Sequence, residues 1–385
     1  MEFALTEEQL MIRESAEGFL AAKSDSAAVR AAMATELGYD VALWQSVCEE
    51  MFWHAVHIPE EHGGLGLGYV EVAVVMEQMG RRLLCSPYFA TVCLGANALL
   101  LAGSEAQKAK WCAEIVEGKT ATLAFSGGGR DWSGQSVTAK FQKNDDSIVL
   151  NGEYQYVVDG HSADILLVAA RDSESDDMAL FVLPAQTAGV RRQWTPTMDQ
   201  TRKLASVSFK SVQLAAENKL QGNDLEAILD LARIALAAEQ CGGAQAILEQ
   251  SVAYVQEREQ FGRTIASFQS IKHKAADMAL QSEVARSAVY YGACVAQEVL
   301  AGSDGDLLVA SELLEAASMA KAYCSDAYFF NAGCGLQMHG GVGFTWEYDV
   351  HLYFKRAKSS ESLLGDGAWN RERLACQLLD QGAAS

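Results

Sequence analysis

Apolar residues near the start of the chain recur at helical spacing. Thr6 stands three positions before Gln9, ahead of an apolar run that begins at Leu10, which is the pattern of a capped helix start. Apolar-rich segments follow at 72–84 and 94–101. These patterns predict an N-terminal α-helical domain over residues 1–119.

From residue 120 the pattern changes to short apolar or alternating runs. Turn-forming residues separate them, as in Asn144-Asp145-Asp146 and Asn151-Gly152. The runs that fit strands are 122–125, 137–141, 148–150, 165–169, 179–183 and 205–209. Runs of this length between turns predict a middle β domain, a barrel or a sandwich, over residues 120–222.

Helical spacing returns at Asn223, which can cap a helix with Glu226 in its first turn. The Ala- and Leu-rich segments that follow are 244–257, 268–301 and 307–336. Such long segments predict an antiparallel four-helix bundle over residues 223–385. We therefore expect an α+β protein in which a helical domain, a β domain and a helical bundle follow one another.

The composition narrows the class of partner. The 385 residues carry a net charge of −20 and half of them are apolar, which allows a large packed interior. So acidic a chain disfavours binding to nucleic acid or to anionic membranes, because both require cationic patches. We expect no membrane span, since no apolar run is long enough, and no signal peptide, since the basic and apolar regions are missing.

The nine cysteines are scattered, with no CxxC pair and no grouping typical of a metal site. We expect them to be buried free thiols, and we expect no metal site. Free thiols fit a reducing compartment, which here means the cytoplasm.

Two motifs in the last domain suggest a site for an anion. Gly340, Gly341 and Gly343 follow Gln337, and glycines let backbone N–H groups approach a phosphate closely. Arg258 opens an Arg-Glu-Gln-Phe-Gly sequence, and arginine offers a fixed fork of donors to the same group. The alternative is that Arg258 ends a surface helix and the glycines only turn the chain.

A series of motifs resembles those of the acyl-CoA dehydrogenase family, in the same order and over nearly the whole chain. They are Leu5-Thr6-Glu7-Glu8-Gln9, Ile58-Pro59-Glu60-Glu61-His62-Gly63-Gly64-Leu65-Gly66, Leu150-Asn151-Gly152, Arg258-Glu259-Gln260-Phe261-Gly262, Phe268-Gln269 and Gln337-x-x-Gly340-Gly341-x-Gly343. Residues 343–347 and 356–358 look most like a bacterial subgroup. That subgroup acts on CoA thioesters of steroid side chains and other bulky acids, often as α2β2 tetramers of unlike subunits.

The resemblance implies FAD-dependent α,β-dehydrogenation of an acyl-CoA, in which a carboxylate removes the α-proton and the flavin accepts a hydride. In the family, FAD lies across a subunit interface: one chain holds the flavin ring and its neighbour holds the ADP arm. The matching ADP-arm positions here are Arg258, Gln260, Phe261, Ile265, Phe268, Gln337, Gly340 and Gly341. An electron-transfer flavoprotein is the implied electron acceptor.

The positions that hold the flavin ring in the family differ here. The family's Leu-Thr-Glu-Pro run corresponds to residues 123–126, followed by glycines at 127–129, and its Trp-Ile-Thr run corresponds to Tyr156-Val157-Val158. Val158 copies the shape of threonine without the hydroxyl, so a hydrogen bond worth about 0.5–1.5 kcal/mol is missing. Backbone groups or water could replace that contact.

The catalytic base of the family is a glutamate at one of two positions. The first corresponds to Ala232, before Arg233. The second falls near Leu364, or at Asp366 if two residues are inserted, although an aspartate between glycines also forms turns. Glu239 is two helical turns from Ala232, roughly 10 Å along a helix axis, which is too far to replace a base there.

Three interpretations follow from the resemblance. The preferred one is a heteromeric enzyme in which this subunit supplies the ADP-arm site and a homologous partner subunit supplies the ring site and the base. The others are a self-sufficient dehydrogenase with Asp366 as the base, and a non-catalytic scaffold of the same fold. Lys272, His273 and Lys274 form a basic cluster, which is either a contact for a CoA phosphate or a solvated helix face.

Overall fold

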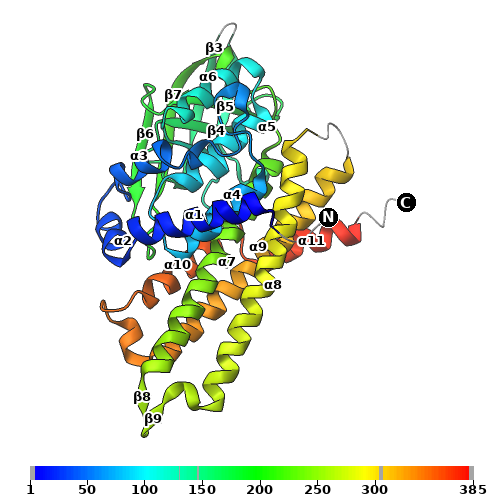
Figure 1. Ribbon diagram of the computed structural model, residues 1–385. Helices are drawn as coiled ribbons and strands as arrows, with labels where there is room; N and C mark the ends of the chain where they lie inside the picture. Colours follow the sequence, from blue (N-terminus) through cyan, green and yellow to red (C-terminus); the bar gives the residue numbers. More distant parts are fainter. Residues whose placement is uncertain (1–4, 130, 145–146, 303–306, 381–385) are drawn as a thin grey trace. The chain divides into compact units, whose positions relative to one another are not determined.

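The computed structural model describes residues 5–129, 131–144, 147–302 and 307–380. The predicted order of helices, then strands, then helices is confirmed (Figure 1). Contacts group the chain into two compact units. One comprises Met1–Arg30, Tyr69–Leu84 and Arg233–Ser385, and the other Ala31–Gly68 and Cys85–Ala232. This grouping follows packing and not the change of secondary structure, so the bounds of the three predicted domains stay predictions.

The second unit contains one curled, mixed sheet. Its strands are β1 (Ala121–Ala124), β2 (Lys140–Asn144), β3 (Ser147–Val158), β4 (Ile165–Asp172), β5 (Met178–Pro184), β6 (Val190–Thr195) and β7 (Leu204–Ala215). The strand order is β1-β4-β2-β3-β7-β6, and β5 pairs with β4. β1 and β4 are parallel, whereas β3 is antiparallel to β2 and to β7.

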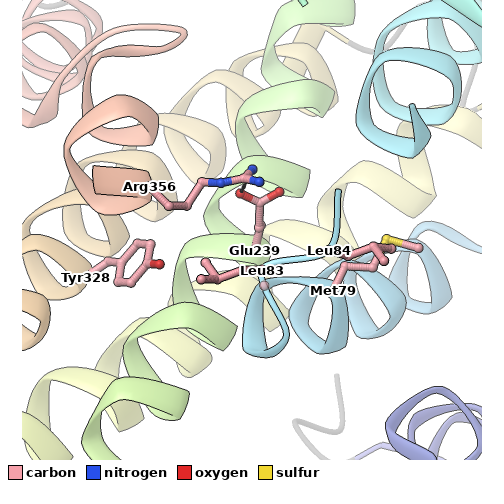
Figure 2. A pocket seen from close by; sticks show the side chains of 7 residues that line it. Met79, Leu83, Leu84, Glu239, Tyr328 and Arg356 are labelled. Carbon is pink, nitrogen blue, oxygen red and sulfur yellow. Dashed lines mark hydrogen bonds and ion pairs between the residues drawn. The ribbon is translucent and has the colours of Figure 1, made fainter. Parts of the chain in front are cut away.

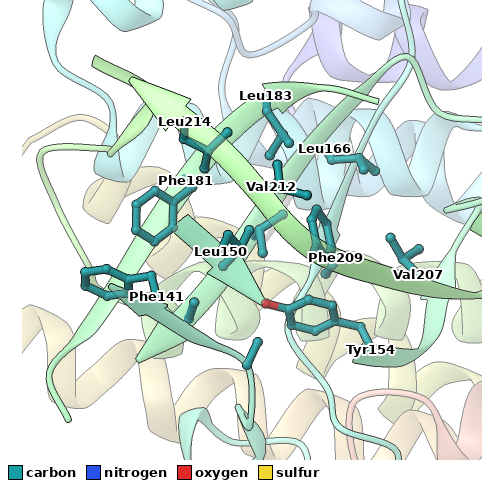
Figure 3. Packing of buried hydrophobic residues seen from close by; sticks show 14 of the residues in the cluster. Phe141, Leu150, Tyr154, Leu166, Phe181, Leu183, Val207, Phe209, Val212 and Leu214 are labelled. Carbon is teal, nitrogen blue, oxygen red and sulfur yellow. The ribbon is translucent and has the colours of Figure 1, made fainter. Parts of the chain in front are cut away.

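Buried aliphatic side chains pack with four aromatic ones in the core of this sheet (Figure 3). The rings of Phe141 and Phe181 meet edge to face at 5.0 Å, and those of Tyr154 and Phe209 at 5.5 Å. The Tyr154 hydroxyl is also buried, and it donates a hydrogen bond to the Ala169 carbonyl at 2.7 Å. Each fully buried phenylalanine contributes about 1.5–3 kcal/mol, so this cluster holds the curled sheet together.

The sequence suggests a turn at Asn151 and Gly152, and this prediction is wrong, because both residues lie inside β3. The register with β7 shifts between Leu150 and Gly152, and Asn151 Oδ1 accepts a hydrogen bond from the Ser211 N–H at 2.7 Å. A Cβ on Gly152 would lie 2.3 Å from the Cβ of Ala139. The Asn-Gly pair therefore forms a bulge where two strands approach closely.

Other strand predictions are correct in place but differ in detail. The run 137–141 forms a strand only from Lys140, because a 3-10 turn at Gly134–Ser136 precedes it. Strand β6 was not predicted. Of the predicted turn at Asn144-Asp145-Asp146, the residues Asp145 and Asp146 lie outside the described part of the chain.

The helices of this unit include α3 (Val41–Glu49), α5 (Asn97–Ala102) and α6 (Glu105–Val116), with a π-helical segment at Phe89–Ala96.

The first unit is helical. Its helices include α1 (Glu7–Lys23), α4 (Tyr69–Arg81), α8 (Gln269–Leu300), α9 (Leu307–His339), α10 (Val350–Ser362) and α11 (Gly367–Asp380), together with α7 (Leu225–Glu257) from Arg233 onward. α9 packs against α8, α10 and α11, and α4 packs against α1 and α8. None of the described helices combines the length and the apolar character needed to cross a membrane.

One predicted helix cap is confirmed and another is wrong. Thr6 and Gln9 form the predicted capping box of α1, in which each side chain binds the other residue's backbone N–H, at 3.2 and 3.0 Å. α7 begins at Leu225, and Asp224 caps it by accepting from the Ala227 N–H at 3.0 Å. Asn223 lies one residue too early to reach the first turn.

Helices α4 and α7 cross at two glycines. A Cβ on Gly80 would lie 2.0 Å from the Glu239 carbonyl oxygen, and a Cβ on Gly242 would lie 1.8 Å from the Glu77 carbonyl oxygen. Only glycine permits backbones to approach this closely. The crossing fixes the part of α7 that carries Glu239.

Replacing Gly242 by alanine should therefore destabilise the protein by about 1–3 kcal/mol, because the added methyl group forces α4 and α7 apart. Thermal unfolding followed by circular dichroism measures the change. Gly18→Ala is the matched control. Gly18 is also inside a helix but has no atom within 4 Å of its virtual Cβ, so this variant should gain about 0.5–1 kcal/mol. Equal stability of both variants would contradict the close crossing.

Candidate functional site

A tight hairpin follows the C-terminus of α7. Its strands are β8 (Glu259–Gln260) and β9 (Arg263–Thr264), and the residues between them, Phe261 and Gly262, have φ angles of 55° and 74°. Two left-handed residues in a two-residue loop are typical of a type I′ turn, which favours asparagine or glycine. Phe261 is instead held in this strained backbone with 92% of its surface exposed, so its ring contributes little to packing within the chain.

The other residues of the first motif surround this hairpin. Arg258 is exposed, and its carbonyl accepts a hydrogen bond from the Ile265 N–H at 2.8 Å. The Arg263 guanidinium lies 4.0 Å above the ring of Phe268, which also contacts the Phe261 ring edge to face. Gln260 is exposed on β8. The motif thus presents two arginines and two aromatic rings on one small, outward-facing element.

The second motif lies at the C-terminus of α9. Gln337 is exposed in the last turn, and the exposed Gly340 and Gly341 open a 3-10 segment, Gly340–Phe344. Gly340 has a φ of 63°, which accounts for glycine there. Gly341 has no such angle, and no atom lies within 4 Å of its virtual Cβ. Nothing within the described chain requires glycine at Gly341, which fits close approach by another molecule.

A shared apolar cluster brings the two motifs to the same end of the helical unit. Its buried members are Leu248, Val255, Met278, Cys334 and Met338, and Ile265 and Tyr254 pack against them. Tyr254, one turn before Arg258, stacks on His339 with ring centroids 4.3 Å apart. His339 Nδ1 donates to the Gly335 carbonyl at 2.8 Å, and burial lowers the pKa of its imidazole. His339 therefore serves as a packing residue at the C-terminus of α9.

The arrangement suits a ligand that combines a flat ring with phosphate groups. Arg258 and Arg263 provide positive charge in a chain whose net charge is −20, the space beside Gly340 and Gly341 is open, and Phe261 offers an exposed aromatic ring. Phosphate oxygens bind well to guanidinium and to clustered N–H donors. The residues present therefore fit an adenosine diphosphate group.

Tyr156 and Val158, the positions that correspond to the family's flavin-ring site, lack the groups that the family has there. Val158 is buried, and its carbonyl accepts a hydrogen bond from Thr122 Oγ1 at 2.6 Å. Tyr156 has a φ of 59° at a bulge in β3 and is 40% exposed. Its ring lies 6.4 Å from that of Trp132, which in turn lies 6.0 Å from that of Phe125. These positions present aromatic rings and aliphatic groups, and Val158 offers no hydroxyl.

The loop between α10 and α11 contains the candidate base positions. Leu364 is buried with a φ of 60°, and Arg233, next to the buried Ala232, donates to its carbonyl at 3.2 Å. Asp366 is exposed, and its carboxylate accepts from the Trp369 N–H at 2.8 Å as the N-cap of α11. A role for Asp366 as a base stays a prediction.

Sequence reasoning missed the buried residue that holds this loop. Lys321, on α9, donates to the carbonyls of Ser360 and Glu361, both at 3.1 Å, and of Gly365 at 2.9 Å. Burial, and then the charge of Arg233, lower the pKa of Lys321 to about 7. A lysine within an Ala-rich helical segment gives no sign that it is buried, because lysine usually lies at a helix surface.

Glu239 forms a buried ion pair with Arg356 at 3.1 Å (Figure 2). The pair lines a narrow crevice with Met79, Leu83, Leu84 and Tyr328 (Figure 2). Removing one partner of such a pair leaves a buried charge, which is strongly destabilising. Glu239 therefore holds α10 against α7, and the expectation that it does not replace a base at Ala232 stays a prediction.

One group of possible metal ligands lies elsewhere. Glu61, His62 and Glu105 bring one ligand atom each within 4.8 Å of one another. Both carboxylates are exposed, and Glu105 accepts a hydrogen bond from the Lys108 ammonium at 2.9 Å. Because that ammonium disfavours a second cation, the expectation of no metal site is kept as a prediction.

Comparisons with known families match most of the chain. Residues 6–119 match the model for the acyl-CoA dehydrogenase N-terminal domain. Residues 223–379 match the model for the acyl-CoA dehydrogenase C-terminal domain.

Individual proteins are similar over almost their whole length. Acyl-CoA dehydrogenase IpdE2 of Mycolicibacterium smegmatis is 32% identical over 375 residues, which cover 97% of this chain and 100% of that protein. Butyryl-CoA dehydrogenase of Megasphaera elsdenii has 28% identity and a TM-score of 0.88, covering 98% of this chain and 100% of that one. A variant of the Tcur3481-Tcur3483 steroid ACAD has 28% identity and a TM-score of 0.86, covering 98% and 99%.

Phe261→Asn should separate stability from ligand binding. Asparagine adopts the left-handed backbone more readily, so we expect a gain of about 1 kcal/mol from relieved strain, measured by thermal unfolding. Affinity for ADP should fall roughly tenfold, since an aromatic contact of about 1–1.5 kcal/mol is removed, measured by titration calorimetry. Phe344→Asn is the control, because Phe344 is 71% exposed without a left-handed φ and should gain no stability. Unchanged stability in Phe261→Asn would show that the turn is unstrained.

Proposed function

The chain belongs to the acyl-CoA dehydrogenase family, and we propose that it serves as one subunit of a heteromeric, FAD-dependent acyl-CoA dehydrogenase. Its own contribution is the site for the ADP arm of FAD. A homologous partner subunit holds the flavin ring and supplies the catalytic base. FAD, when bound, supplies the hydride acceptor for the reaction.

The observation that carries this proposal is the contrast between the two halves of the cofactor site. Phe261 and Gly341 have features that packing within the chain does not require, namely an exposed ring on a strained backbone and a glycine facing open space. In contrast, Val158 has no hydroxyl and the base positions hold Ala232 and Leu364. A subunit that contributes only the ADP-arm half of the cofactor site must keep the residues of that half. The residues of its flavin-ring half can change.

In this role each described residue has a defined task. The guanidinium of Arg258 pairs with the pyrophosphate, and the backbone at Gly340 and Gly341 approaches the phosphates or ribose closely. Phe261 and Phe268 bound the adenosine side with their rings. No proton is transferred by these residues, so the chain binds and orients the cofactor while the chemistry is completed across the interface.

The substrate is proposed to be the CoA thioester of a bulky acid of the steroid side-chain type, with an electron-transfer flavoprotein as electron acceptor. Support for the substrate class comes from the 28% identity to a steroid ACAD, and from the sequence features at 343–347 and 356–358. The assembly we propose is an α2β2 tetramer, and the free cysteines of the described chain support a location in the reducing cytoplasm.

We expect the purified chain alone to carry little FAD and to be inactive, and co-expression with its homologous partner to yield a yellow, active complex. The reason is that each chain alone offers only part of the contacts to the cofactor. The measurement is FAD per chain from the flavin absorption band, together with dehydrogenase turnover on steroid side-chain CoA thioesters. A yellow, active homo-oligomer of this chain would rule the proposal out.

Asp366→Asn in the co-expressed complex tests the alternative base. Asparagine still accepts the hydrogen bond from the Trp369 N–H, so α11 stays capped. We expect near-normal turnover with unchanged flavin content. A loss of several orders of magnitude would instead assign the base to this chain. A colourless complex with every homologous partner would favour the scaffold interpretation.

A further inference from the structure

A lysine outside the predicted site contacts one of its residues. Lys274, in the first turns of α8, donates a hydrogen bond from its ammonium to Gln337 Oε1 at 2.5 Å. Lys274 thus joins the basic cluster at 272–274 to the end of α9. The contact links two helices that both end at the candidate ADP-arm site.

This contact determines which way the Gln337 amide points. An ammonium carries only donors, whereas a glutamine amide has an acceptor oxygen and a donor NH2 group. The oxygen therefore faces Lys274, and Nε2 faces away. Within the part of the chain that the structure describes, Gln337 Nε2 donates to no protein acceptor, and Gln337 is exposed. The group that Gln337 presents to solvent is consequently its NH2 group, a hydrogen-bond donor.

We propose that Lys274 is a positioning residue that orients the Gln337 amide so that it donates to an acceptor atom of the bound nucleotide. The inference rests on the proposed function for the nature of the ligand, the ADP arm. Ring nitrogens of adenine, ribose oxygens and phosphate oxygens are all acceptors, so an outward NH2 group matches this ligand. Without Lys274 the amide rotates freely and presents its oxygen part of the time.

A direct contact between Lys274 and a phosphate is the competing explanation, and a double-mutant cycle separates the two. If Lys274 acts through Gln337, its removal has no further effect once the amide is gone. If Lys274 binds the ligand itself, the two losses add, as they do for independent contacts. Methionine is a suitable replacement for both residues, since it keeps the length of the side chain without hydrogen-bonding groups of comparable strength.

The experiment measures ADP affinity by titration calorimetry on the co-purified complex after removal of FAD, for Lys274→Met, Gln337→Met and the double variant. We expect Gln337→Met to weaken ADP binding about tenfold, which corresponds to the loss of one hydrogen bond. Lys274→Met should weaken it about fivefold. In the Gln337→Met background the same change should add less than about twofold.

Two further variants serve as controls. Lys272→Met removes an equal charge from the same helix at an exposed position, so it measures the general electrostatic loss that both lysines share. Lys274→Arg keeps a donor-only group and should restore ADP affinity to within about twofold of the unsubstituted protein. Thermal unfolding of every variant confirms that the fold is retained.

The outcomes distinguish the inference from the proposed function. Additive losses in the cycle, or a loss in Lys272→Met equal to that in Lys274→Met, overturn the positioning role while the ADP-arm site stands. Failure of the unsubstituted complex to bind ADP overturns both. A non-additive cycle together with rescue by arginine supports the assignment of Lys274.

Discussion

The meeting of α7, α8 and α9 at one end of the helical unit is the constraint on which the site depends. Leu248 and Val255 of α7, Met278 of α8 and Met338 of α9 share a buried cluster there. Burying side chains of this size contributes about 1.5–3 kcal/mol each. Because the cluster joins segments distant in sequence, the hairpin after α7 and the glycines after α9 lie on neighbouring elements. Loss of this packing would separate Arg258 from Gly340 without altering either motif.

The hairpin shows how the helices and the site depend on each other. β8 and β9 are two residues long, and so short a hairpin is not stable by itself. It persists because Ile265 anchors it to the apolar cluster and its N–H binds the Arg258 carbonyl. The stable helices thereby keep Phe261 in a backbone conformation that an isolated peptide would avoid. Strain of this kind is usually found where a surface binds another molecule.

The sequence predicts the order of helical and strand segments well, because that order depends on local patterns of apolar residues. Thr6 and Gln9 form a capping box that can be recognised from their spacing, and the long Ala-rich segments could only form helices. Strand β6 was missed because its residues, 190–195, are partly exposed and include two arginines. The Asn151-Gly152 pair predicts a turn but forms a bulge, because turns and bulges both favour Asn-Gly.

Long-range polar contacts could not be predicted in the same way. Lys321 binds carbonyls that lie about forty positions later in the chain, and nothing in the neighbouring sequence specifies those partners. The same holds for Lys274 and Gln337, which lie 63 positions apart. A pattern of apolar positions shows which face of a helix is buried, but it does not show which charged residue the fold encloses.

The loop around Leu364 is held by more hydrogen bonds than the packing of a leucine requires. Arg233, Lys321 and Asn370 bind its carbonyls from three different helices, and Leu364 itself is held in a left-handed conformation. The direction in which its side chain points is therefore set by the surrounding donors and not by the leucine. Any side chain introduced at position 364 would start from a backbone that is already fixed, so its only remaining freedom would be that of its own rotamers.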